Sequence, residues 1–430
     1  MQPTNPLSLR RNFSWTFLGN AVYAACQWGM LIVLAKLGSP EMVGQFTLGL
    51  AVSAPVFMFT NLQLRNIQAT DAKRQYLFGD YLALRLIATG VALLVILGIT
   101  LVSGYRREIL LIILLVGLAK AFESISDVFY GFIQHHERMD KIAISLMIRG
   151  LSSLLVLSFG IYLSGAMVWG LLGLAIVWGA ILIGWELRSA AVLTLNQTEH
   201  KTKQPYQNSS PWQLQPCWDL KTLRKLTWLA LPLGFVMMLI SLNINIPRYL
   251  IEGYLGEREL GIFAALAYLM MAGNTIVFAL GDSASPRLAR YYASGKIKAF
   301  RTLLLKLMGI AFLLGVASIS LSLVAGKQIL TLVYQPEYGE YADLFVWLMV
   351  VAAFNYVSSF LGYAITAARY FRIQIPLLTL TITTSTLACL WLLPRYGLQG
   401  VVIAQILAAF VQIFTSSGVI IYALKRIDQY

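Results

Sequence analysis

The pattern that decides the fold is Leu37-Gly38-Ser39-Pro40-Glu41-Met42-Val43-Gly44-Gln45-Phe46, which is followed by Leu50-Ala51 and occurs twice in the chain. The second copy is Leu255-Gly256-Glu257-Arg258-Glu259-Leu260-Gly261-Ile262-Phe263, followed by Leu266-Ala267. Allowing two single-residue gaps, both copies read Leu-Gly-x-x-Glu, then Gly-x-Phe, then Leu-Ala. Each copy joins two long apolar segments, and such a repeat is typical of membrane transporters built from two related halves. We expect the copies to form matching outer corners of two lobes, as scaffold rather than as site.

The composition indicates a polytopic membrane protein. Hydrophobic residues make up 58% of the chain and charged residues only 12%, about half the charged fraction of a soluble domain. The apolar residues form about twelve blocks of ~20 residues or longer, enough to cross a ~30 Å hydrocarbon core as helices. The blocks are residues 13–37, 42–63, 81–104, 109–133, 142–163, 167–187, 226–250, 260–281, 303–325, 344–366, 373–394 and 398–424. We therefore predict an all-α fold of about twelve transmembrane helices in two six-helix lobes.

One long polar stretch, residues 189–219, lies midway along the chain and contains few aliphatic residues. Such a segment cannot bury enough apolar surface to form a core of its own. We predict a first lobe over residues 1–188, a cytoplasmic linker over 189–225 and a second lobe over 226–430. A shorter charged stretch, residues 65–80, is either an amphipathic surface helix or an ordinary loop.

Lysine and arginine residues indicate the orientation. If the N-terminus is cytoplasmic and the spans alternate, most of the 33 cations, Arg85 among them, fall in inner segments. The outer segments hold Lys36, Arg106, Arg107, Arg248, Arg258, Lys327 and Arg395, and two more cations lie inside spans. This bias predicts that both termini are cytoplasmic. The net charge of +14 is then mostly a topological signal, and no soluble basic domain suggests a nucleic-acid partner.

The fourth span carries three ionisable residues on one stripe. At ~100° per residue, Lys120 and Asp127 lie within about 20° of each other, with Glu123 about 60° away. Such a stripe should face a bundle interior or a wet cavity rather than lipid. Arg149 in the fifth span falls near the depth of Asp127 and Glu123, so a salt bridge is expected there. These groups either serve transport or only neutralise one another, as Arg149 with Asp127 or Glu123 and Lys120 with Glu123, and the sequence leaves both possibilities open.

Other polar residues inside spans are weaker candidates. Asn20 and Gln27 share a face of the first span, Asn245 and Arg248 share a face of the seventh, and Asn274 lies inside the eighth. Each alone is more often a helix–helix hydrogen bond than a ligand contact. The chain has no G-x-x-x-x-G-K-[ST], H-E-x-x-H or C-x-x-C pattern, so we expect no ATP-driven motor, metal or cofactor.

Three further segments carry a family resemblance. They are Asn61-Leu62-Gln63-Leu64-Arg65-Asn66 with Thr70-Asp71, Leu242-Asn243-Ile244-Asn245-Ile246-Pro247-Arg248-Tyr249, and Ala284-Ser285-Pro286-Arg287-Leu288-Ala289-Arg290-Tyr291-Tyr292. In order and spacing the chain resembles the bacterial O-antigen type polysaccharide flippases of the multidrug/oligosaccharidyl-lipid/polysaccharide exporter superfamily. The resemblance covers nearly the whole chain except the linker. It implies a two-lobed, non-enzymatic exporter of the bacterial inner membrane that moves a polyprenyl-pyrophosphate-linked oligosaccharide by alternating access.

On that resemblance, the cations become candidate ligands of the pyrophosphate, because guanidinium forks bind phosphate oxygens in bidentate fashion. We expect Lys120, Arg149 and Arg248 in the lumen, Arg65 at its inner mouth, and Asn20, Gln27, Asn245 and Asn274 as polar substrate contacts. Glu123 and Asp127 are the candidate proton or cation carriers. The implied partners are the lipid-linked oligosaccharide, membrane lipids and the polysaccharide polymerase machinery.

Three other functions stay open: a drug antiporter of the same superfamily, a flippase for lipid-linked peptidoglycan precursors, and a membrane glycosyltransferase or polymerase. An antiporter would prefer an acidic or aromatic lumen, and peptidoglycan precursor flippases often carry extra spans. An enzyme would need catalytic acids facing an aqueous side, and the outer loops of this chain are short.

Overall fold

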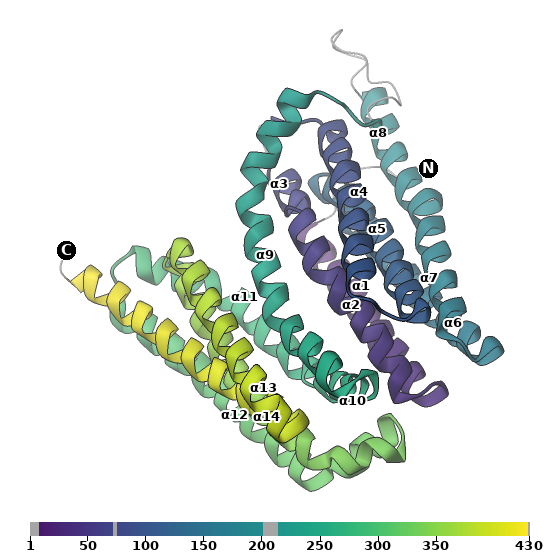
Figure 1. Ribbon diagram of the computed structural model, residues 1–430. Helices are drawn as coiled ribbons and strands as arrows, with labels where there is room; N and C mark the ends of the chain where they lie inside the picture. The colour runs from purple at the N-terminus through teal and green to yellow at the C-terminus, as the bar shows by residue number, and fades with distance from the viewer. Residues whose placement is uncertain (1–7, 72–74, 201–213, 429–430) are drawn as a thin grey trace. The chain divides into compact units, whose positions relative to one another are not determined.

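The computed structural model describes residues 8–71, 75–200 and 214–428. Within these residues every regular element is a helix (Figure 1). The chain divides into two compact units. The first comprises residues 1–38 and 45–241, and the second comprises residues 39–44 and 242–430.

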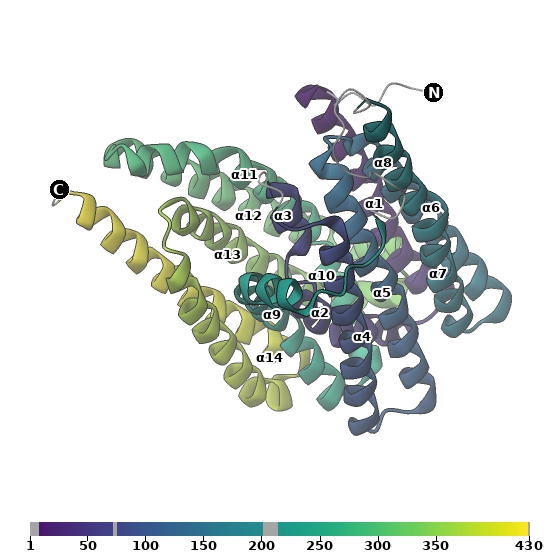
Figure 2. The same ribbon diagram turned by 90° about the horizontal axis from the view of Figure 1, so that it is seen from above.

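The first unit contains a bundle of long apolar helices. Its elements are α1 (Leu9–Leu37), most of α2 (Pro40–Thr60), the short α3 (Leu64–Thr70), α4 (Phe78–Val102), α5 (Arg107–His135), α6 (Met139–Ser164), α7 (Met167–Ile181), a π-helical turn (Leu182–Leu187) and α8 (Arg188–His200). Helix α6 packs on α1 and α7, while α5 packs on α3, α4 and α7 (Figure 2). Gly165 ends α6 in the left-handed region at φ +66°, where glycine carries no Cβ penalty.

The boundary between the two units falls inside α9 (Leu220–Leu255), and the second unit begins at Leu242. It continues through α10 (Glu257–Tyr268), α11 (Met271–Ala293), α12 (Ile297–Val333), a 3₁₀ turn (Pro336–Tyr341), α13 (Ala342–Ala367) and α14 (Phe371–Asp428). Helix α13 packs on α11, α12 and α14. Its core gathers around buried aromatic side chains such as Phe300, Tyr356 and Phe360.

The helices confirm a polytopic all-α membrane protein. Among the described residues, ten helices are long and apolar enough to cross a membrane, or eleven if the bent pair α10–α11 counts as one span. The longest, Arg372–Arg426, is interrupted at Gly397, where φ is +58°, so it holds two of the twelve predicted spans. Large apolar side chains such as Val102 and Phe414 lie exposed on the helix surfaces, as expected of side chains that face lipid tails.

The polar stretch predicted as a linker is partly helical. The sixth span continues through the π-helical turn into α8, which ends at His200. Residues 201–213 of the predicted linker lie outside the described residues. The chain then returns to α4, where the backbone N–H of Cys217 donates to the carbonyl oxygen of Gly79 at 2.9 Å.

Residues 40–44 of the first copy of the repeated pattern pack directly against the second copy within the second unit. A Cβ placed on Gly44 would overlap the carbonyl oxygen of Glu257, and one placed on Gly261 would overlap the carbonyl oxygen of Pro40. The same Cβ on Gly261 would lie 2.8 Å from the backbone nitrogen of Gly44. The glycine shared by the two copies therefore lets two backbones approach closely.

Candidate functional site

A polar cavity of about 140 Å³ lies inside the first unit. Its walls come from α1, α3, α5 and α6, and the lining residues are Thr16, Asn20, Tyr23, Arg65, Glu123, Asp127, Tyr130, Met139, Ile142, Ala143, Leu146 and Arg149. Four of these side chains are ionisable as carboxylates or guanidinium groups. A cavity with such a lining inside an apolar bundle is a functional candidate, because charged side chains are costly at membrane depth.

Arg65 reaches the cavity because the chain turns sharply after α2. Leu62 and Gln63 both adopt left-handed backbone conformations, with φ of +51° and +53°, which costs about 1–2 kcal/mol per residue for side chains other than glycine. The turn sends α3 back against α5 at Gly131, where a Cβ would overlap the side-chain oxygen of Gln68 and lie 3.3 Å from the Cα of Arg65. This segment, whose form the sequence left open, is therefore helical at its start and holds a cation over the cavity.

Asp127 contacts two guanidinium groups. Arg65 Nη1 lies 3.5 Å from Oδ1 of Asp127, and Arg85 Nη2 lies 3.4 Å from Oδ2. Arg65 also donates from Nε to Gln134 at 3.1 Å. Arg85, which is expected among the cations of the inner segments, is fully buried in the second turn of α4. A carboxylate on α5 compensates its charge inside the bundle.

Glu123 is bound by a cation and a phenol. Lys120 Nζ lies 2.6 Å from Oε2, and the Tyr23 hydroxyl donates to Oε1 at 3.1 Å. The Lys120 ammonium also lies 5.7 Å from the ring centroid of Trp178, within the range of cation–π attraction. The Lys120–Glu123 pair expected from the i, i+3 spacing is thus confirmed.

Arg149 has a different partner from either expected one. Its Nη2 atom lies 2.8 Å from Oε1 of Glu186 and donates to Ser126 at 2.6 Å. Glu186 Oε1 also accepts hydrogen bonds from Tyr130 at 2.8 Å and Ser145 at 2.7 Å. Arg149 and Glu186 are both fully buried, so this pair is a packed, neutralised contact at the edge of the cavity.

Sequence reasoning missed Glu186 although it lies inside a predicted span. It belongs to the π-helical turn Leu182–Leu187, and such turns often occur at functional positions. The signal that could have found it is charge balance, since a buried arginine needs a nearby carboxylate. The cavity lining itself holds two arginines (Arg65, Arg149) and two carboxylates (Glu123, Asp127), and Arg85, Lys120 and Glu186 contact these residues from outside the lining.

The weaker candidates divide between the two units. Asn20 lines the cavity, and its amide donates to the Thr16 carbonyl at 2.8 Å. Gln27 is half-buried on α1 and is not among the lining residues. Arg248 and Asn245 lie in the second unit, where the guanidinium donates to the amide oxygen at 3.1 Å. Asn274 lies near the start of α11, also in the second unit.

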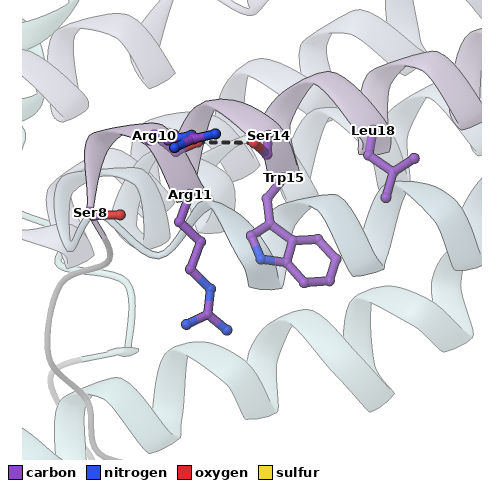
Figure 3. Close-up of a pocket in the computed structure, with 6 residues that line it drawn as sticks. All are labelled: Ser8, Arg10, Arg11, Ser14, Trp15 and Leu18. Atoms are coloured by element: carbon purple, nitrogen blue, oxygen red, sulfur yellow. Dashed lines mark hydrogen bonds between the residues drawn. The ribbon is translucent and has the colours of Figure 1, made fainter.

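A larger hollow, about 330 Å³, lies at the start of α1 (Figure 3). Its lining residues are Ser8, Arg10, Arg11, Ser14, Trp15 and Leu18, all from one end of the chain. Arg10 and Arg11 are exposed there. No second helix among the described residues supplies an opposing polar wall, so we favour the smaller cavity as the functional site. Among those same residues, no group of three or more His, Cys, Asp or Glu side chains is placed to hold a metal ion.

The bundle of long apolar helices defines a polytopic all-α membrane protein. Solved structures share this fold over 96% of the chain at low sequence identity. An inward-facing multidrug resistance MATE family transporter of the MOP superfamily matches with TM-score 0.69 and 15% identity, covering 98% of that structure. A MOP superfamily transporter from Pyrococcus furiosus, whose binding pocket is described as having reverse polarity, matches with TM-score 0.58 and 16% identity over 94% of that structure.

The family follows from the sequence itself. Residues 9–292 match the model of the family described as "Polysaccharide biosynthesis protein", and the chain belongs to this family. It is also similar to the capsular polysaccharide biosynthesis protein CapF of Staphylococcus aureus, with 28% identity over 409 residues, 94% of this chain and 97% of that protein. The family description concerns polysaccharide biosynthesis, and the solved transporter structures share the fold of this chain.

Proposed function

We propose that this protein exports a polyprenyl-pyrophosphate-linked oligosaccharide across the bacterial inner membrane by alternating access, with both termini cytoplasmic. The observation that carries the proposal is the polar cavity lined by Arg65 and Arg149, with the Arg65 side chain 30% exposed at its wall. A sugar-pyrophosphate headgroup cannot cross hydrocarbon unaided, because its polar groups would lose their hydrogen bonds. A cation-lined polar cavity supplies those bonds, and a guanidinium group suits the pyrophosphate oxygens.

Arg65 is the cation best placed to bind the headgroup. Its side chain is 30% exposed and its ion pair with Asp127 is long, at 3.5 Å. Arg149 is buried against Glu186 and Lys120 is paired closely with Glu123, so neither offers an unshared charge to the cavity. Asn20 adds an amide at the same wall. The roles of Lys120, Arg149, Arg248, Gln27, Asn245 and Asn274 as substrate contacts stay predictions.

Replacing Arg65 with glutamine is expected to reduce export by about 10–100-fold, because one charge-assisted interaction contributes about 1.5–3 kcal/mol. The measurement is the amount of lipid-linked oligosaccharide that accumulates on the inner leaflet of cells carrying the variant. Arg107→Gln, at the exposed start of α5, removes the same charge away from the cavity and should export normally. Normal export by Arg65→Gln would reject the site. Lost polymer with normal flipping would instead favour a polymerase, and unchanged oligosaccharide with lost drug efflux would favour a drug antiporter.

We also propose that an ion gradient drives the export and that Glu123 and Asp127 carry the coupling ion. Both carboxylates are about 30% exposed and line the cavity beside the proposed headgroup site. Their ion pairs can therefore exchange partners when a cationic or anionic ligand enters.

Glu123→Gln and Asp127→Asn are each expected to remove most of the dependence of export on an imposed proton or sodium gradient. The assay follows oligosaccharide transfer in proteoliposomes with and without the gradient. Glu108→Gln, at the exposed first turn of α5, provides the matched control. If both variants still respond to the gradient as the parent does, the coupling role of these residues is wrong.

A further inference from the structure

Asp127 is shared by two arginines that differ in exposure. The side chain of Arg65 is 30% exposed, that of Asp127 is 29% exposed, and that of Arg85 is not exposed at all. Each guanidinium occupies a different carboxylate oxygen, at 3.5 Å and 3.4 Å. One arginine can therefore leave Asp127 while the other stays.

Arg85 is fixed in place by polar groups behind the cavity. Its Nη1 atom donates to the side-chain oxygen of Asn61 and to Ser124 at 3.2 Å. Ser124 in turn donates to Asn61 at 2.6 Å, which closes a small buried network. Arg85 is absent from the cavity lining, so it faces Asp127 from the protein side and a ligand in the cavity does not contact it.

Arg65 is held differently. It lies on α3 after the left-handed turn at Leu62 and Gln63, and its other contacts are a hydrogen bond to Gln134 and the ring of Tyr130, whose centroid is 5.5 Å away. Backbone strain of this kind persists only where the surrounding structure enforces it, and it clusters at ligand-binding positions. The strained turn and the close approach at Gly131 bring this one cation to the cavity.

We propose that Arg65 and Arg85 form a counter-ion exchange around Asp127, an inference that rests on the proposed function. A phosphate oxygen of the substrate takes Arg65 away from Asp127, and Arg85 then keeps the carboxylate compensated. Arg85 is thus a positioning residue that sets the affinity for the anion without touching it. Without Arg85, the anion could bind only by leaving a partly buried carboxylate without any cation, which carries a large penalty.

The test measures binding of inorganic pyrophosphate to the purified full-length protein by calorimetry, and its first arm is Asp127→Asn. This change removes the competitor for Arg65, so pyrophosphate should bind about tenfold more tightly, as expected for one charge-assisted interaction. Arg65→Gln should weaken binding at least about tenfold on the same basis. Glu108→Gln changes the net charge by the same amount as Asp127→Asn but lies ~28 Å along α5 at 1.5 Å per residue, and it should leave the dissociation constant near that of the parent.

A second arm tests Arg85 itself. Arg85→Gln should weaken pyrophosphate binding, and the double variant Arg85→Gln with Asp127→Asn should restore it, because the competing carboxylate is then gone. If Arg85→Gln alone does not fold, the double variant decides the matter, because without Asp127 the loss of Arg85 should leave pyrophosphate binding as in Asp127→Asn, and weaker binding would overturn the exchange.

The outcomes separate this inference from the function on which it rests. Pyrophosphate binding that Arg65→Gln leaves unchanged would reject the anion site and with it the proposed function. Binding that depends on Arg65 but is unchanged or weakened in Asp127→Asn would overturn only the exchange. An Arg85→Gln protein that folds and binds like the parent would overturn it as well.

Discussion

Glu186→Ala is expected to destabilise the first unit by about 3–5 kcal/mol, because it leaves a buried arginine without its carboxylate. Arg149 is fully buried, and its ionic partner is Glu186. The same change removes the acceptor for Tyr130 and Ser145, which adds the cost of unsatisfied buried donors. The measurement is the midpoint of thermal unfolding of the purified protein in detergent.

The control for Glu186→Ala is an ion pair at the surface. Glu337→Ala removes the partner of Arg258, whose side chain is 52% exposed, and exposed pairs contribute about 0–1 kcal/mol. A loss of stability no larger than that of Glu337→Ala would contradict the buried-pair argument.

A double replacement separates packing from transport. Arg149→Met with Glu186→Leu should recover most of the stability lost in Glu186→Ala, because apolar side chains of similar size often replace a buried ion pair without loss. If this double variant also exports the oligosaccharide, Arg149 serves the bundle rather than the substrate. Loss of export with recovered stability would indicate that Arg149 contacts the substrate.

The sequence was most informative where the physics is local. Apolar block length predicted the spans, and the charges on one helical stripe predicted the Lys120–Glu123 pair, because both depend only on the geometry of a single helix. The apolar block lengths likewise divided the 55-residue helix Arg372–Arg426 into two spans, and the structure interrupts that helix at Gly397. No comparison between distant segments was needed for these predictions.

The parts that escaped prediction depend on contacts between distant segments. Glu186 and Arg149 are separated by 37 positions in the sequence, and Arg85 and Asp127 by 42 positions. No helix periodicity links residues so far apart. The turn that delivers Arg65 to the cavity uses Leu62 and Gln63 in left-handed conformations. Because neither residue is a glycine, the usual sequence signal for that conformation is absent.

The repeated pattern carries the second large prediction. Gly261→Ala and Gly44→Ala are each expected to destabilise the second unit by about 3 kcal/mol, since a methyl group would overlap a backbone carbonyl that cannot move aside. Gly44 lies against the carbonyl of Glu257, and Gly261 lies against the carbonyl of Pro40. Each glycine therefore makes room for a backbone carbonyl of the other copy. The measurement is the thermal midpoint and the fraction of protein that remains monodisperse in detergent.

Gly253→Ala is the matched control, because it lies inside α9 and a Cβ there would meet no atom within 4 Å. Alanine at such a helical position should raise stability by up to about 1 kcal/mol, in the opposite direction to the two corner variants. If Gly44→Ala and Gly261→Ala unfold at the temperature of Gly253→Ala, the corner is not closely packed. If both lose stability to the same extent, the duplicated pattern persists in the chain for a mechanical reason. Each copy needs its glycine because the other copy's backbone occupies the space of the missing side chain.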